Sequence, residues 1–126
     1  MILVQSEARV DPANRAAFEE QGREGHWPAL QHFGAQMIAY GTWAFGGPDD
    51  VVVTSTVYQD LDHWAATRRD GAYYRDPAIL DEIRDLLPKY ADRDGLVRSS
   101  SARLLEIDEQ VSRPEVFRRG AGQRLA

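Results

Sequence analysis

Side chains along residues 2–10, ILVQSEARV, follow a period of two, with mostly apolar residues at the even positions and mostly polar ones at the odd positions. The even positions carry Ile2, Val4, Ser6, Ala8 and Val10, and the odd positions carry Leu3, Gln5, Glu7 and Arg9. A period of two predicts a β-strand that presents one side to a core and the other outward. The same alternation returns in residues 97–107, VRSSSARLLEI, which predicts a last strand near the end of the chain.

A helix is expected directly after the first strand, because Asp11 can cap it and Pro12 suits its first position. Two glycines weaken this helix, and we expect a break at residues 25–27. Pro28 then restarts a short helical segment, and Gly34 can close it in the left-handed conformation.

Residues 35–45 and 51–58 are rich in β-branched and aromatic side chains, and the stretch GGPDD between them predicts a five-residue hairpin loop. Asp60 is expected to cap a following helix, and Asp76 with Pro77 to start another helical segment. Apolar side chains at helical spacing continue that segment to Pro88, and residues 89–95 are expected to form a loop.

The predicted order of elements is therefore βαββαβ. This order is typical of an α+β, ferredoxin-like domain, in which a four-stranded antiparallel sheet carries its helices on one face. The other face mixes Leu3 with Gln5, Glu7 and Arg9, and we expect a second copy of the sheet to cover it in a homodimer.

The composition narrows the possible partners of this chain. Its 126 residues suit a single domain, and the absence of cysteine excludes disulfides and thiolate chemistry. A formal charge of -5 argues against a nucleic-acid partner. No apolar stretch is long enough to cross a membrane or to serve as a signal peptide, so we expect a cytoplasmic protein with no membrane association.

Three stretches resemble the NIPSNAP family of the dimeric α/β-barrel superfamily: GAQMIAYGTW, VVVTSTVYQDLDHWAATRRDGAYYRDP and SSARLLEI. The resemblance implies a homodimer of ferredoxin-like subunits whose sheets form a barrel, with a pocket between sheet and helices. It spans most of residues 1–108, which we take as one domain, and leaves residues 109–126 as an extension that is mobile or packed on the partner. It supplies no reaction, because relatives include cofactor-free monooxygenases, heme-degrading enzymes, polyketide cyclases and isomerases.

Two histidines are candidates for proton transfer. His63 falls in the first turn of the helix after Asp60, and His26 falls at the predicted helix break beside Trp27. The alternatives are a surface position for His63 and a packing or capping role for His26. His32 lacks a carboxylate at a metal-ligand spacing, so we expect neither a metal site nor heme, and no cofactor.

Aromatic and hydroxyl side chains are candidates for binding a hydrophobic small molecule, because ligand sites combine apolar walls with a few polar groups. Rings from neighbouring strands and the following helix are expected to gather at one end of the sheet, beside hydroxyls on its inner face. The candidates are Ser6, Tyr40, Trp43, Thr54, Thr56, Tyr58, Trp64 and Tyr73. The alternative is that these rings are core and that the hydroxyls bond to neighbouring backbone.

Two functional hypotheses remain open at this point. One is a cofactor-independent enzyme that acts on an aromatic or polyketide-like molecule of secondary metabolism, by proton transfer, cyclisation or oxygenation. The other is a non-catalytic dimeric module that binds a ligand or a partner.

Overall fold

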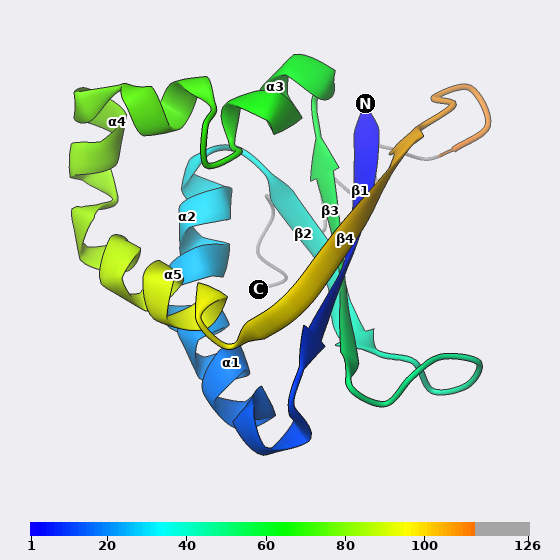
Figure 1. Cartoon of the computed structure of the whole chain (residues 1–126). Coiled ribbons are helices and arrows are strands. Elements are labelled where there is room, and N and C mark those ends of the chain that lie inside the picture. The colour runs from blue at the N-terminus through cyan, green and yellow to red at the C-terminus, as the bar shows by residue number, and fades with distance from the viewer. Residues whose placement is uncertain (113–126) are drawn as a thin grey trace, which may run out of the picture.

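Four antiparallel strands form one sheet in the order β2-β3-β1-β4 (Figure 1). In this computed structural model, which describes residues 1–112, the strands are β1 (Ile2–Val10), β2 (Gln36–Thr42), β3 (Val51–Tyr58) and β4 (Val97–Glu106). Helical segments connect β1 to β2 and β3 to β4, and they lie on one side of the sheet. The predicted α+β, ferredoxin-like fold is confirmed.

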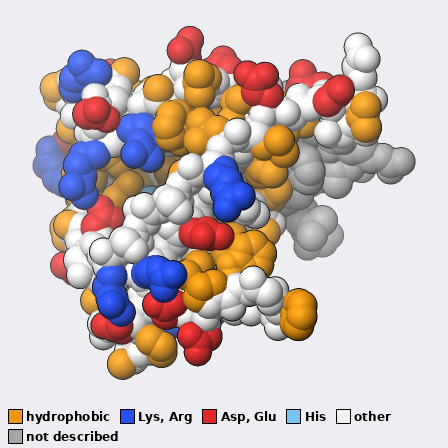
Figure 2. Space-filling model, turned by 45° about the vertical axis from the view of Figure 1, so that its right-hand side comes forward, with side chains coloured by type: hydrophobic (Ala, Val, Ile, Leu, Met, Phe, Trp, Pro, Cys, Tyr) orange, Lys and Arg blue, Asp and Glu red, His pale blue; other side chains and the backbone are white. Residues whose placement is uncertain are grey.

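The alternation in β1 divides the sheet into two faces. Ile2 and Val4 are buried against Leu30 of the first helical connection, so the even positions of β1 face the helices. Leu3 is paired with Val57 and Leu105 and lies on the open face. In Figure 2, where the open side is turned toward the viewer, hydrophobic side chains are mixed with charged ones.

The first connection stays helical throughout, so the predicted break at residues 25–27 is wrong. It consists of η1 (Pro12–Asn14), α1 (Arg15–Gln21), the π-helix η2 (Gly22–His26) and α2 (Trp27–His32). The wider π-turn accommodates the glycine-rich GREGH stretch without ending the helix. Gly34 closes the connection with a φ of 85°, as predicted.

The second connection contains α3 (Leu61–Ala66), η3 (Ala72–Arg75), α4 (Pro77–Glu82), η4 (Arg84–Leu86) and α5 (Leu87–Asp94). The caps predicted at Asp60 and Asp76 are confirmed, because Asp60 accepts a hydrogen bond from the His63 backbone and Asp76 accepts one from Ala78. The Asp11 side chain makes no cap hydrogen bond within residues 1–112 and accepts from Arg98 instead. The loop predicted at residues 89–95 is wrong. Pro88 lies in the first turn of α5, where its missing N–H costs nothing, and the helix continues.

The core is divided into three clusters, and this division decides which part of the sheet is covered. Two clusters join the sheet to α1 and α2, around Val4 and Phe18. The third, around Phe33 and Ile83, joins α2 to η3, α4 and α5, which lie beyond α2 in Figure 1. As a result, Ala102 and Leu104 are exposed although their register with β1 places them on the helix-facing side.

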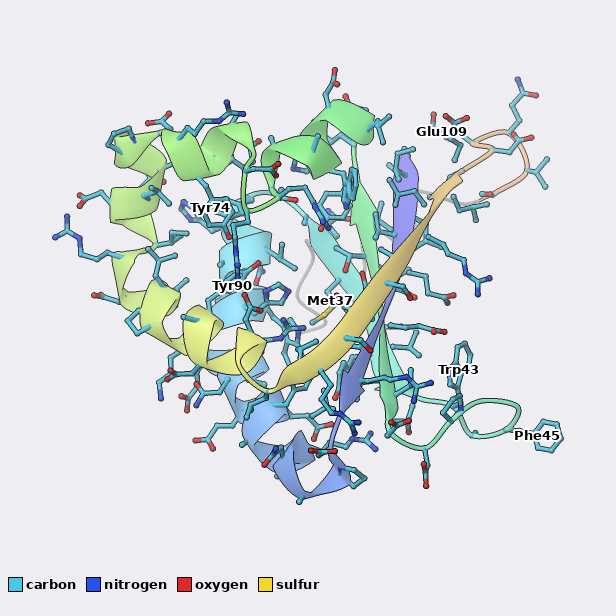
Figure 3. The ribbon with its side chains drawn as sticks, viewed as in Figure 1. Met37, Trp43, Phe45, Tyr74, Tyr90 and Glu109 are labelled. Carbon is cyan, nitrogen blue, oxygen red and sulfur yellow. The ribbon has the colours of Figure 1, made fainter. Side chains whose placement is uncertain are left out.

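The β2–β3 loop is longer than predicted, since β2 ends at Thr42 and β3 begins at Val51. Trp43 is 39% exposed and Phe45 is 94% exposed, and both lie in this loop (Figure 3). The predicted C-terminal extension falls largely at residues 113–126, outside the described residues. Up to residue 112, no helix has the length and apolar character needed to cross a bilayer.

Candidate functional site

A row of polar side chains crosses the helix-facing side of the sheet. Tyr40 on β2 is paired with Thr54 on β3, and Thr54 is paired with Ser6 on β1. The row ends at the exposed Ala102 on β4. Within residues 1–112, the hydroxyls of Ser6 and Thr54 make no hydrogen bond, so both remain available to a ligand.

Thr56 lies one pair further along the same face and is 5% exposed. Its neighbours in the register are Val4 on β1 and Met37 on β2. Figure 3 shows Met37 between the sheet and the helices. The period-two pattern therefore placed Ser6, Thr54 and Thr56 correctly on one face.

His63 links the start of α3 to the end of α2. Its Nε2–H donates to the Phe33 carbonyl at 2.7 Å, and its Nδ1 accepts from the Gln59 backbone N–H at 3.1 Å. These two bonds fix the neutral tautomer and occupy both ring nitrogens. The structure therefore gives His63 a structural role and leaves it no free nitrogen for a substrate.

The rings around His63 form a cluster at this end of the sheet. Tyr58 lies 5.3 Å and Tyr73 lies 6.5 Å from His63 between ring centroids, and Tyr73 is 5.1 Å from Phe33. Trp64 packs against the core cluster of Ile2, Val4, Leu30, Ala35 and Tyr58. Tyr58, Trp64 and Tyr73 are thus brought together, as predicted.

Trp43 does not belong to this cluster, and the prediction that grouped it with Tyr58 is wrong. Tyr58 is paired with Ile2 at one end of the sheet, whereas Thr42, directly before Trp43, is paired with Val52 toward the other end. Figure 3 shows Trp43 in the hairpin loop. Neighbouring strands were correctly expected, but an antiparallel pair brings opposite chain ends together.

His26 is the last residue of the π-helix and faces α5. Its ring lies edge-on to Tyr90, with 4.5 Å between the centroids. Its Nδ1 is inaccessible to solvent and has no hydrogen-bond partner within residues 1–112. Burial lowers the pKa of His26 to about 3, and the positive charge of Arg93 contributes to this shift. His26 is therefore a neutral imidazole at pH 7.

Three more buried polar atoms that lack a partner in the described part of the chain come from helices of the two helical connections. They are Gln21 Oε1, Trp27 Nε1 and Arg93 Nε. Buried polar groups in proteins are nearly always hydrogen-bonded, so unpaired ones call for a water or a ligand. Trp27 connects this group to the sheet, because its ring lies 5.1 Å from the ring of Tyr40 between centroids.

Tyr40 joins the two halves of the candidate site. Its hydroxyl donates to Glu19 Oε2 at 2.7 Å, and Glu19 is also paired with Arg15. Burial is the main cause that raises the pKa of Tyr40 to about 12, and the bond to Glu19 adds to it. Tyr40 is therefore a neutral phenol that is held in place between the hydroxyl row and Trp27.

The residues that the sequence did not indicate as candidates are Gln21, Trp27 and Arg93. The sequence predicts a loop at Arg93. In the structure Arg93 lies in α5, three residues after Tyr90 and on the same helical face. If the sequence had indicated a helix at α5, its spacing would have placed Arg93 beside Tyr90. In the described part of the chain, no group of three or more His, Cys, Asp or Glu side chains is placed to hold a metal ion.

Comparison with known proteins adds information about the fold. No protein-family profile and no curated protein matches the chain. A NIPSNAP family protein from Agrobacterium tumefaciens C58 superposes with a TM-score of 0.61 and 22% identity, over 85% of this chain and 86% of that one. The fold is that of the NIPSNAP structures.

Two further NIPSNAP structures show the same likeness. A NIPSNAP domain protein from Burkholderia xenovorans has a TM-score of 0.58 and 17% identity, over 85% of this chain and 94% of that one. A second A. tumefaciens NIPSNAP family protein, of unknown function, has a TM-score of 0.58 and 21% identity, over 85% and 87%. At these identities the NIPSNAP likeness establishes the fold, and function has to be argued from the site.

Proposed function

We propose that the protein binds a small aromatic or polyketide-like molecule between the helix-facing side of its sheet and the helices η2, α2 and α5. The observation that carries this proposal is the group of buried, unpaired polar atoms on Gln21, His26, Trp27 and Arg93. A ligand that bears both a hydroxyl and a carbonyl group would supply the missing hydrogen bonds, because Gln21 Oε1 needs a donor whereas Trp27 Nε1 and Arg93 Nε need an acceptor.

Access and apolar contacts support the same location. Ala102 and Leu104 are exposed on the helix-facing side, so the helices leave this edge of the sheet uncovered. Trp27 and Tyr40 supply flat apolar surfaces, and the unbonded hydroxyls of Ser6 and Thr54 lie in the same row as Tyr40. Ligand sites in proteins combine these features.

Binding is tested by the quenching of tryptophan fluorescence with 2-tetralone, a neutral aromatic ketone. We expect saturable quenching that is retained in Trp43→Phe, because Trp43 lies in the distant hairpin loop. Trp27→Phe is expected to remove a large part of the quenching. Quenching that rises linearly without saturation, or that depends mainly on Trp43, would contradict the proposed location.

A second candidate function is enzymatic, and the state of His26 favours it. A histidine with a pKa near 3 is a weak base at pH 7, but its neutral ring can donate a hydrogen bond to a carbonyl oxygen that becomes negative during enolisation. In this role His26 would polarise the substrate carbonyl without any cofactor, and a water molecule would take the C–H proton and release it to solvent.

The enzymatic candidate is tested by following exchange of the acidic C–H protons of 2-tetralone in D2O by NMR. The protein should accelerate exchange, and His26→Phe should reduce the acceleration by about a hundredfold. If 2-tetralone binds but the exchange rate does not change, the protein is the non-catalytic binding module.

We also infer that the protein is a homodimer joined through the open face of its sheet. Leu3 and Leu105 form an apolar row across two strands of that face, and Leu105 is 60% exposed, whereas Val57 on the neighbouring strand β3 is already buried. Gln5 and Arg103 form the adjacent polar pair in the register. An isologous contact would cover the apolar row and leave polar groups to pair across it.

A further inference from the structure

We propose that the site recognises the anionic group of its ligand, a carboxylate or an enolate attached to an apolar ring, and that Arg93 is the residue that selects this charge. The inference rests on the proposed function and specifies its ligand class. It comes from the way in which two arginines share one carboxylate beside the unpaired donors.

The first observation is an excess of positive charge in a buried position. The Arg93 side chain is only 12% exposed, and its Nη1 lies 3.3 Å from Asp94 Oδ1. The other oxygen of Asp94 is paired with Arg69 at 2.8 Å, and the Arg69 side chain is 84% exposed. One carboxylate thus serves two guanidinium groups, and the buried Arg93 has the longer of the two contacts.

The second observation concerns the orientation of Arg93. Its guanidinium lies over the ring of Phe18, with 4.4 Å from Cζ to the ring centroid. This contact holds the plane of the group and leaves its edge available for hydrogen bonds. The Nε–H on that edge is buried and has no acceptor among the residues that the structure describes.

The third observation is that the neighbouring unpaired groups include a second obligate donor. An indole N–H can only donate, and the Nε1 of Trp27 is buried without an acceptor. Trp27 and Arg93 both lie near Tyr40, because the Trp27 ring is beside the Tyr40 ring and Arg93 lies over Phe18, whose core cluster Tyr40 packs against. His26, whose titration Arg93 influences, completes the group and can donate from Nδ1 in one tautomer.

Two fixed donors and an under-compensated positive charge match an acceptor that is itself negative. Hydrogen bonds between charged groups are about twice as strong as neutral ones. A neutral ligand would accept hydrogen bonds from Trp27 and Arg93. Arg93 would then still share the negative charge of Asp94 with Arg69. The arrangement therefore favours an anionic oxygen over an amide or alcohol oxygen.

The test compares 2-naphthoate with 2-naphthamide, which has nearly the same shape and no charge, by isothermal titration calorimetry. We expect the full-length wild-type protein to bind 2-naphthoate about tenfold or more tightly than 2-naphthamide. Arg93→Gln should remove this preference. Equal affinity of the two probes in the wild-type protein would overturn the inference while leaving the proposed binding site intact.

A second variant avoids any change in the buried group. Arg69→Gln returns the whole of Asp94 to Arg93, so 2-naphthoate should bind several-fold more weakly while 2-naphthamide is unaffected. Arg98→Gln is the matched control, because it removes an equal charge from an exposed pair with Asp11. If both variants weaken 2-naphthoate equally, the shared carboxylate has no special role and the inference fails.

The probes also separate the two proposals. If 2-tetralone binds but neither naphthalene probe does, the anionic preference is wrong and the binding site stands. If none of the three probes binds, the proposed function fails and the inference fails with it.

Discussion

The two histidines considered as proton carriers differ most clearly in the number of ring nitrogens that remain free. Both nitrogens of His63 are bonded within the protein, to the Phe33 carbonyl and the Gln59 N–H. His26 has an unpaired Nδ1 and faces Tyr90. The sequence placed each of them correctly at a helix start or irregularity, but partners from distant segments decide their roles.

Replacing His63 by Ala should destabilise the fold. The change removes two hydrogen bonds and leaves the Phe33 carbonyl, which is part-buried in this contact, without its donor. We expect the free energy of unfolding to fall by about 1–3 kcal/mol in urea titrations. His32→Ala is the control, since its pair with Glu82 is exposed and should contribute at most about 1 kcal/mol.

His26 should make the free energy of unfolding depend on pH in the acidic range. In the folded protein its pKa is about 3, against 6.5 for the unperturbed side chain, because it is buried and close to Arg93. Between these two pH values His26 binds a proton in the unfolded chain but not in the folded protein. The contribution of His26 to the free energy of unfolding is therefore complete above pH 6.5 and is lost as the pH falls. The loss approaches about 1.4 kcal/mol for each pH unit below 6.5.

The check is to measure unfolding free energies of the wild-type protein and His26→Phe at pH 7 and pH 4.5. Relative to the variant, the wild-type protein should lose about 2–3 kcal/mol between these conditions. Parallel pH profiles for the two proteins would show that His26 titrates normally in the folded state.

At the scale of elements, η2 and α5 approach each other closely at Gly25. A Cβ on Gly25 would lie 2.6 Å from Lys89 Cβ and 2.8 Å from the Tyr90 backbone nitrogen. Gly25→Ala should therefore push η2 and α5 apart and cost about 1–3 kcal/mol of unfolding free energy. It should also disturb the contact of His26 with Tyr90.

Gly95→Ala is the matched control for that change. Gly95 follows α5 with a φ of -64°, and a Cβ there would come no closer than 3.4 Å to another atom. We expect this variant to be neutral or slightly stabilised, because Ala restricts the unfolded chain. Equal destabilisation by both substitutions would contradict the close packing of η2 on α5.

The strands and caps were predictable because their signals are local. Period-two alternation identified β1 and β4, and the caps at Asp60 and Asp76 each involve residues two or three positions away. The sequence did not indicate the π-helix and α5, because their helical state depends on contacts between segments that are distant in the sequence. A glycine pair and a proline usually interrupt helices, and here tertiary packing between η2 and α5 holds both segments helical.

At the scale of the whole molecule, a dimer of the 14.2 kDa chain is expected from the open sheet face. Light scattering at micromolar concentration should report about twice the chain mass. Leu105→Glu should shift the protein toward the monomer, because it places a charge in the apolar row that Leu105 forms with Leu3. Leu61→Glu, at an exposed position on α3, should leave the mass unchanged.

The candidate site combines what the sequence indicated with what only the fold brings together. The hydroxyl row of Ser6 and Thr54 follows from strand alternation once the register is known. The grouping of His26, Trp27 and Arg93 joins the first and second helical connections, and no local pattern reports that contact. The misplaced Trp43 shows the same limit, because a strand pattern does not say at which end of a hairpin the loop begins.

Because of the π-helix Gly22–His26, the geometry of this site depends on the number of residues in the first helical connection. Each residue of an α-helix advances the chain by about 100°, and a π-turn holds one residue more than an α-turn. Deleting one residue from this stretch would let it rewind as an α-helix and would turn α1, with Phe18 and Glu19, by about that angle relative to α2. Phe18 would then leave Arg93, and Glu19 would leave Tyr40, although every one of these side chains would still be present.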